Sequence, residues 1–265
     1  MPIVGTHQKT ERRVIPSCIR MAVMLSYERP GLLSTTLTSL MEVSPSLPIV
    51  VYDDGSQSPE KLEELNKLSG IVKIERGEHL GLVRTWVKAF QDLRKMGLSK
   101  DDGVVLLEDD LLFAKGWDEV LLRMASGTAD VGLSPGAMTC FRCHEHPQSG
   151  SFDLRGVEAY QSMQHGFQLN MVPASVFEQM EFFEEAARNS EAGRHGIDVW
   201  FIGGLSHRLG LTSMVSRDSM VAHIGAGNSI AGKQGFESFT GMGYNIPVDL
   251  LRKAASVISV FGEHP

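Results

Sequence analysis

The sequence predicts an α/β protein with a mixed, mainly parallel central sheet, flanked by helices and forming a single domain. Two observations lead to this fold class. Short apolar segments of strand type alternate with amphipathic helical segments through residues 19–110, and each apolar segment runs into a polar loop. The 265 residues and ordinary composition suit one large α/β domain. In such folds, ligands bind at the carboxyl ends of the strands.

The first half of the chain supplies most of the predicted sheet. Strands are expected at residues 19–25, 48–52, 71–75 and 104–107. Helices are expected between them, where apolar side chains recur at helical spacing, at residues 31–43, 60–68 and 82–96. Ser58 followed by Pro59 is typical of a helix start, and Gly97 is typical of a helix end. This alternation predicts parallel pairing with right-handed crossovers.

The second half is less regular. Strands are expected at residues 130–133, 168–172 and 219–222, and helices at residues 117–124, 173–188 and 197–209. Residues 139–167 lack a clear period, which is typical of a long functional loop. Six glycines fall between Gly225 and Gly243, so we expect a mobile segment that closes over a ligand.

The strand at residues 104–107 runs directly into Glu108, Asp109 and Asp110. Three adjacent carboxylates repel one another unless a cation lies among them, and hard divalent cations prefer oxygen ligands. We therefore predict a metal site here. The alternative is that Asp109 or Asp110 caps the helix expected near Trp117.

Composition excludes some classes of function. A net charge of −7 disfavours a broad surface for nucleic acid, although five basic residues are candidates for a local patch: Arg142, Arg155, Arg188, Arg194 and Lys233. Three cysteines and a polar start predict a reducing, cytoplasmic setting. No run approaches the roughly 18 apolar residues of a membrane span.

Five polar landmarks follow one another along the chain: residues 26–30, residues 53–56, residues 108–110, Asp198, and His223 to Gly225. In this order they resemble the landmarks of GT-A fold glycosyltransferases, close to the family-2 type. The resemblance covers roughly residues 19–225. It implies a Rossmann-like GT-A fold and transfer of a single sugar from a nucleotide-diphosphate donor, which we expect to be a UDP-sugar, to an acceptor hydroxyl.

The resemblance also divides the chain. Residues 1–18 would be an N-terminal extension and residues 19–225 the catalytic domain. Residues 226–265 would form a glycine-rich C-terminal segment that is a candidate lid over the active site.

By the resemblance, the first two landmarks bind the donor nucleotide. Ser26, Tyr27 and Arg29 would line its pocket. Asp53 would accept a hydrogen bond from the base, and Asp54 would support the loop.

The third and fifth landmarks would hold Mn²⁺ or Mg²⁺. Asp110 would bind the metal and His223 would complete its shell, whereas Glu108 and Asp109 would lie on the donor side, with Glu108 facing the ribose. Cationic support for the diphosphate is expected from Arg29 and Arg84. A core histidine is the alternative for His223, and a solvated surface arginine is the alternative for Arg84.

Asp198 is the candidate catalytic base, which would make the transfer inverting. The helix dipole normally lowers the pKa of a carboxylate at a helix start, so the base role requires partial burial. A plain helix cap is the alternative.

Two departures from the family pattern narrow the function. The acidic motif begins with Glu108 rather than an aspartate, and the Gln-x-x-Arg-Trp segment of processive synthases is missing. A processive membrane enzyme is therefore not expected. Two other functions stay open: a sugar nucleotidyltransferase, which would need a more basic and glycine-rich first loop, and a non-catalytic nucleotide- or carbohydrate-binding module.

The acceptor is not specified by the sequence. A glycan, a protein, a metabolite or a hydroxylated DNA base would each offer a hydroxyl, and the last must leave the base stack. A zinc site is a further alternative for four residues in the irregular stretch, although they are crowded for a tetrahedral ion: Cys140, Cys143, His144 and His146. We prefer to interpret them as an acceptor-side loop.

Overall fold

The computed structural model describes residues 14–142, 149–163, 165–193, 196–225 and 245–261. Within these ranges the larger sheet has nine strands, in the order β3 (Lys73–Arg76), β2 (Ile49–Asp53), β1 (Cys18–Ser26), β4 (Asp102–Glu108), β9 (Leu169–Pro173), β6 (Pro135–Thr139), β10 (Thr212–Ser216), β8 (Glu158–Gln161) and β7 (Ser149–Asp153). The block from β3 to β4 is parallel, and β6 is parallel to β10. The other pairs are antiparallel. The expected mixed α/β fold is confirmed.

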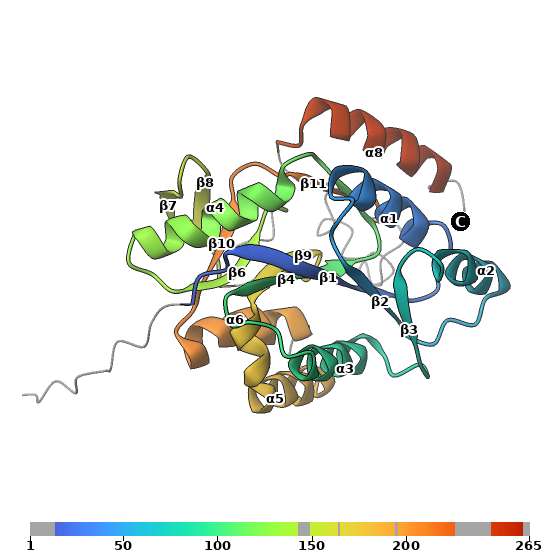
Figure 1. The fold of residues 1–265 in the computed structure, drawn as a ribbon, viewed down its shortest axis with the longest axis horizontal. Coiled ribbons are helices and arrows are strands. Elements are labelled where there is room, and N and C mark those ends of the chain that lie inside the picture. The colour runs from blue at the N-terminus through green and yellow to red at the C-terminus, as the bar shows by residue number, and fades with distance from the viewer. Residues whose placement is uncertain (1–13, 143–148, 164, 194–195, 226–244, 262–265) are drawn as a thin grey trace, which may run out of the picture.

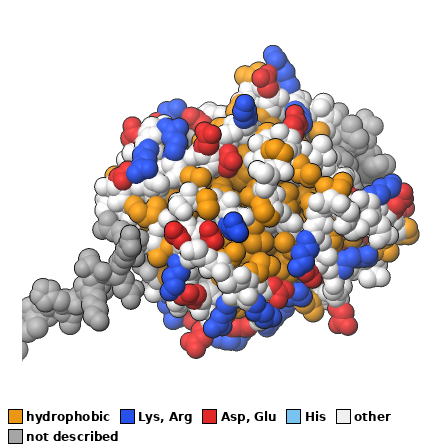
Figure 2. Space-filling model, in the orientation of Figure 1, with side chains coloured by type: hydrophobic (Ala, Val, Ile, Leu, Met, Phe, Trp, Pro, Cys, Tyr) orange, Lys and Arg blue, Asp and Glu red, His pale blue; other side chains and the backbone are white. Residues whose placement is uncertain are grey.

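Helices cover both faces of this sheet. In Figure 1, α3 (Leu82–Lys95), α5 (Met180–Glu191) and α6 (Ile197–Leu209) lie below it. The opposite side carries α1 (Leu32–Val43), α4 (Trp117–Asp130) and α8 (Val248–Phe261), and α2 (Pro59–Leu68) lies beyond β3. Figure 2, a space-filling view in the orientation of Figure 1, shows charged side chains mainly towards the rim of the molecule and hydrophobic ones towards its centre.

The central strands are buried on both faces. Val104 and Leu106 of β4 pack in one hydrophobic cluster with α3, α5 and α6, while Val105 and Leu107 pack in the other with α1 and α4. All four side chains are fully buried. A continuous apolar run, rather than an alternating one, is what a strand covered by helices on both sides requires. This explains why the sequence signal for β4 was strong.

A second, two-stranded sheet follows directly after the acids. Here β5 (Leu111–Phe113) pairs antiparallel with β11 (Val221–His223), and their register sets His223 opposite Leu111. Helix α8 packs against this small sheet. The pairing joins two segments that are far apart in the sequence at the end of β4.

Several expected elements are wrong in the second half. A strand was expected at 130–133, but α4 extends to Asp130 and β6 begins at Pro135. The helix expected at 173–188 is a 3-10 helix η1 (Ala174–Glu178) followed by α5, because Gln179 leaves the helical region with φ −95° and ψ 53°. Strands β5, β6 and β10 were not expected, and neither was the hairpin of β7 and β8. Every residue of β10 is buried, including its polar ones, so no alternating pattern marks it.

The loop and tail predictions are partly outside the described residues. The irregular stretch 139–167 contains the β7 and β8 hairpin, and part of the glycine-rich tail is helix α8. Residues 1–13 and 226–244 lie outside the described ranges, so the extension and the lid stay predictions. None of the helices that are described has the length and apolar character needed to cross a membrane.

Candidate active site

Glu108 ends β4, and Asp109 and Asp110 form the turn between β4 and β5, which three contacts to its backbone hold in place. The Thr36 hydroxyl donates to the Asp109 carbonyl oxygen at 2.8 Å and accepts from the Leu111 N–H at 2.9 Å. The Ile224 N–H donates to the Asp110 carbonyl oxygen at 2.9 Å. Helix α1 and the end of β11 therefore hold the turn from two sides. The alternative of an Asp109 or Asp110 helix cap is wrong, because Gly116 precedes α4.

Glu108, Asp110 and His223 converge on one point. One ligand atom from each lies within 4.8 Å of the other two. The Nε2 atom of His223 is 3.1 Å from Oδ2 of Asp110. Gly225 makes this approach possible, because a Cβ atom there would lie 2.1 Å from the same Asp110 oxygen. The glycine in the fifth landmark is thus explained by space beside Asp110.

This group fits a divalent cation. Asp110 and His223 are almost fully buried, and Oδ1 of Asp110 has no hydrogen-bond partner among the described residues. A buried carboxylate oxygen without a partner is costly unless a ligand satisfies it. Two carboxylates with one imidazole form a donor set suited to Mn²⁺, and the carboxylates also suit Mg²⁺.

The electrostatics of the group follow from its burial. Burial raises the pKa of Glu108 to about 7, and the carboxylates of Asp110 and Asp198 add to this rise. Burial alone would also raise the pKa of Asp110, but His223 and Arg29 outweigh it and hold this pKa well below its usual range. Burial would lower the pKa of His223, yet the attraction of Asp110 and Glu108 raises it. The site therefore favours bound positive charge.

Asp109 faces basic residues instead of the His223 group. The Ser26 hydroxyl donates to Oδ2 of Asp109 at 2.5 Å. Arg29 forms ion pairs with both Asp109 and Asp110, the latter at 2.7 Å. The ammonium of Lys61 lies 3.8 Å from Asp109. Asp110 thus belongs to the possible metal group, whereas Asp109 contacts Ser26, Arg29 and Lys61 on the side of β1.

Lys61 is a residue that sequence reasoning missed. Its side chain is fully buried and its ammonium is 2.8 Å from Glu64. Glu64 in turn accepts hydrogen bonds from the N–H groups of Gly31 and Ser34 at the start of α1, at 3.0 and 2.8 Å. A usable signal existed, because Lys61 shares its helix face with Leu65 at the i, i+4 spacing and Leu65 is a core residue. A lysine on the apolar face of a helix needs a buried partner.

The second landmark forms a self-supporting loop. The Asp53 carboxylate accepts hydrogen bonds from the hydroxyl and N–H of Ser56, at 2.6 and 3.1 Å. Asp54 accepts from the hydroxyl of Thr85 at 2.6 Å and from the N–H of Gly81 at 3.2 Å, so it ties this loop to the start of α3. These contacts tie Asp54 into the loop, and its role in the donor site, like base binding by Asp53, stays a prediction.

Tyr27 has an aromatic partner that was not expected from the sequence. His79 stacks on it, with ring centroids 4.4 Å apart and an interplanar angle of 18°. Both side chains are exposed. Gly55, at φ +73°, allows this packing, because a Cβ atom there would lie 2.4 Å from the backbone nitrogen of His79. The pair forms a flat aromatic surface beside the Asp53 loop.

Asp198 is the second residue of α6, and Gly196 occupies the capping position before it. Burial raises the pKa of Asp198, although backbone N–H groups at the helix start act in the opposite direction. The carboxylate is close enough to Glu108 to raise the pKa of that group as well. A base at this position requires partial burial, and Asp198 meets this condition.

Comparison with known proteins decides the family. The family described as Glycosyl transferase family 2 matches residues 21–168, more than half of the chain. The chain belongs to glycosyl transferase family 2. This family consists of glycosyltransferase enzymes, as the resemblance in the sequence implied. A search of curated proteins finds no match.

A solved structure supports the GT-A fold of this family 2 chain. GalNAc-T7, crystallised with UDP, GalNAc and Mn²⁺, superposes with a TM-score of 0.50 at 16% identity, over 80% of this chain and 44% of that chain. The mannosyltransferase PcManGT from Pyrobaculum calidifontis, in complex with GDP-Man and Mn²⁺, gives a TM-score of 0.45 at 13% identity, over 79% and 60%. The family 2 chain thus spans less than half the length of GalNAc-T7.

Arg84 is not brought to the acids of the family 2 chain. Its guanidinium forms an ion pair with Glu191 of α5 and lies 3.6 Å from Glu184 of the same helix. Both contacts join α3 to α5 on the lower face of the sheet in Figure 1. To bind phosphate, Arg84 would have to break its ion pair with Glu191, so this role stays a prediction.

The cysteine and basic clusters predicted from the sequence lie partly outside the described residues. Cys143, His144, His146, Arg194 and Lys233 lie outside the described residues. Cys140 is fully buried in the core, and burial raises the pKa of its thiol. Arg155 is paired with Asp130.

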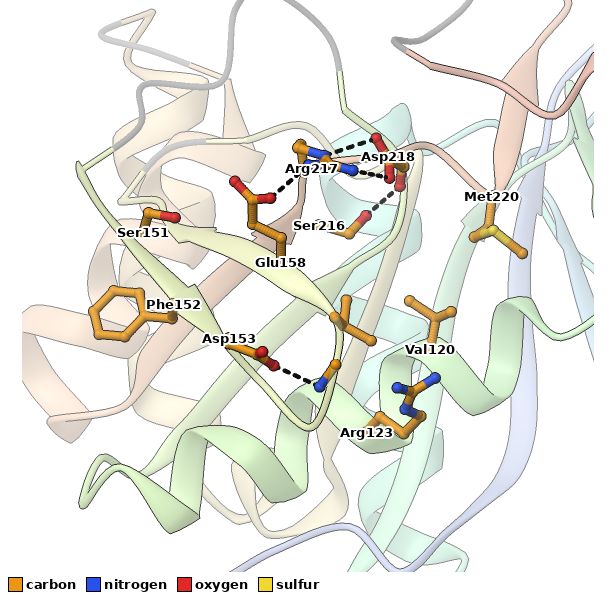
Figure 3. Close-up of a pocket in the computed structure, with 12 residues that line it drawn as sticks. Val120, Arg123, Ser151, Phe152, Asp153, Glu158, Ser216, Arg217, Asp218 and Met220 are labelled. Carbon is orange, nitrogen blue, oxygen red and sulfur yellow. Dashed lines mark hydrogen bonds and ion pairs between the residues drawn. The ribbon is translucent and has the colours of Figure 1, made fainter.

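A separate pocket of about 570 Å³ lies between α4, the β7 and β8 hairpin and the turn before β11 (Figure 3). In this view Arg217 lies between Glu158 and Asp218, with ion pairs of 2.6 and 3.0 Å. Asp153 on the opposite wall accepts the N–H of Gly156. Because these charges already have partners, we assign the pocket no part in the reaction.

Proposed function

We propose that this chain transfers a single sugar from a nucleotide-diphosphate donor to an acceptor hydroxyl and that Glu108, Asp110 and His223 hold the Mn²⁺ or Mg²⁺ that the reaction needs. The observation that carries the proposal is the convergence of these three residues within 4.8 Å at the carboxyl end of β4. Ligands of open α/β sheets bind at this edge. Family membership supplies the reaction class.

The donor is proposed to be a UDP-sugar whose nucleotide lies along the ends of β1 and β2. There Tyr27 and His79 offer a flat aromatic surface to a base, and Arg29 offers a guanidinium to the diphosphate. A divalent cation, when bound, balances the negative charge of the leaving nucleoside diphosphate. GalNAc-T7 was crystallised with UDP and Mn²⁺. This pair is therefore the first to test.

Asp198 is proposed as the general base of an inverting transfer. The acceptor oxygen would form a bond to the anomeric carbon while the bond from that carbon to the diphosphate oxygen breaks, and the hydroxyl proton would pass to the Asp198 carboxylate. A carboxylate with a raised pKa accepts a proton more readily than an ordinary aspartate. Inversion follows if attack and departure take place on opposite faces of the sugar.

A reducing compartment also belongs to the proposal. It is supported by the odd cysteine count and by the free thiols of Cys18 and Cys140. The proposed acceptor is a hydroxyl, which a glycan, a protein, a metabolite or a hydroxylated DNA base each supplies.

The proposal is tested by incubating the protein with UDP-sugars and Mn²⁺ and measuring UDP release with and without candidate acceptors. We expect wild type to release UDP only with divalent metal, and Asp110→Asn to be inactive while remaining folded. Full metal-dependent turnover by Asp110→Asn would contradict the metal assignment. NMR of the product decides the stereochemistry, and a retained anomeric configuration would remove the base role of Asp198.

A further inference from the structure

Arg29 binds one oxygen of the carboxylate that the metal site needs, whereas the other oxygen, Oδ1, has no partner among the described residues. Its Nη1 atom donates to Oδ2 of Asp110 at 2.7 Å, and its Nη2 atom pairs with Asp109. The same Oδ2 atom is 3.1 Å from Nε2 of His223. The guanidinium therefore bridges an acid of the metal group to an acid outside it.

The loop before α1 is shaped to hold Arg29 in this place. Glu28 and Arg29 have φ values of 50° and 40°, in the left-handed region that side chains other than glycine rarely adopt. Glu28 stabilises the conformation: its N–H donates to the hydroxyl of Ser56 at 2.8 Å, and its carboxylate accepts from the N–H groups of Gln57 at 2.7 Å and Ser58 at 3.2 Å. These contacts lie away from the acids. They hold the backbone of Arg29 beside the turn between β4 and β5.

A divalent cation and the Arg29 guanidinium compete for Asp110. Both need the lone pairs of the same buried carboxylate, and two cations in contact at a site of low dielectric repel strongly. Asp109 is not part of the metal group, so its ion pair with Arg29 survives when Asp110 is taken. Arg29 then stays tethered beside the metal with half of its donors free. A diphosphate is the anion whose oxygens suit these donors.

We propose that Arg29 is an internal counter-ion of the metal site, which neutralises Asp110 in the free protein and turns to the donor diphosphate when a divalent cation takes Asp110. The second half of this inference rests on the proposed function, and the first half does not. One consequence is cooperativity. Metal binding frees Arg29 for the nucleotide, and by reciprocity the nucleotide favours metal binding.

The test is a calorimetric titration of MnCl₂ into the full chain, without nucleotide and with saturating UDP. We expect Arg29→Gln to bind Mn²⁺ alone on the order of tenfold more tightly than wild type, the lower end of the coupling measured for close charge pairs. The increase in Mn²⁺ affinity that UDP causes should shrink by a similar factor. Arg208→Gln is the matched control, because Arg208 is an exposed arginine paired with Glu185 on α5, and it should match wild type in both titrations.

Equal or weaker binding of Mn²⁺ alone by folded Arg29→Gln would overturn the inference. If Arg29→Gln does not fold, Arg29→Lys decides, because a single ammonium cannot bridge Asp109 and Asp110 and should also bind Mn²⁺ more tightly than wild type. Failure of the proposed function has a different appearance: UDP would leave Mn²⁺ affinity unchanged in every variant, while the comparison with Mn²⁺ alone would still stand.

Discussion

Replacing Lys61 with methionine tests the buried charges beneath the acidic turn. The side chain is fully buried, with its ammonium 2.8 Å from Glu64 and 3.8 Å from Asp109. Methionine keeps much of the volume and removes the charge, so two buried carboxylates lose a cation. Breaking a buried ion pair from one side costs about 3–5 kcal/mol. The free energy of unfolding should fall by about this amount, a large part of the roughly 5–15 kcal/mol of a typical domain.

The assay is urea denaturation at pH 7 followed by far-UV circular dichroism, with two comparison variants. Lys67→Met changes an exposed lysine on the same helix, where the pair with Glu63 is solvated, and should alter the unfolding free energy by less than about 1 kcal/mol. Lys61→Met combined with Glu64→Gln removes both charges but keeps an oxygen for the N–H groups of α1, so it should regain much of the loss. A loss below about 1 kcal/mol for Lys61→Met alone would refute the reasoning.

Three further predictions concern the reaction site. Gly225→Ala puts a Cβ atom 2.1 Å from Oδ2 of Asp110. Calorimetry on the folded variant should therefore show Mn²⁺ affinity at least about tenfold weaker than that of wild type, and an unchanged affinity would contradict the packing argument. Asp198→Asn should abolish transfer but keep UDP binding with Mn²⁺. Because burial raises the pKa of Asp198, the wild-type pH–rate profile should rise through a pKa above the usual value of about 3.9. Above that pKa the buried carboxylate of the wild type is ionised, so the variant should resist urea better than the wild type there. His79→Ala removes a ring stacked on Tyr27, so UDP affinity measured with Mn²⁺ should fall about twofold to tenfold, and no change would exclude His79 from base binding.

The first half of the fold was predictable because its signals are local. Strand β4 reads as an unbroken apolar run since both of its faces are covered, and α3 repeats its apolar residues at helical spacing. Glu108 ends β4 and the two aspartates follow it, so the edge of the sheet on which the acids lie followed from the parallel topology. The acidic part of the candidate site was therefore visible before the structure.

The rest depends on contacts between distant segments, which local patterns do not encode. The resemblance predicted His223 as a metal ligand, but its contact with Asp110 could not be derived from local patterns, because it depends on the pairing of β11 with the three-residue strand β5, which is too short for any periodic signal. Lys61 meets Asp109 from another helix, and Arg29 reaches the acids through a left-handed loop held by Glu28. In the second half, β10 was not predicted as a strand, because its serine and threonine residues are buried and so leave no alternation of polar and apolar residues in the sequence.

The most direct test of the central claim is a thermal-shift panel of UDP, GDP, CDP and TDP, each with and without Mn²⁺, on wild type and Asp110→Ala. The account predicts that one nucleotide, expected to be UDP, raises the Tm of wild type only when Mn²⁺ is present and that Asp110→Ala loses this shift. A Tm unaffected by every nucleotide with Mn²⁺, or an equal shift in Asp110→Ala, would contradict a metal-dependent donor site at the end of β4.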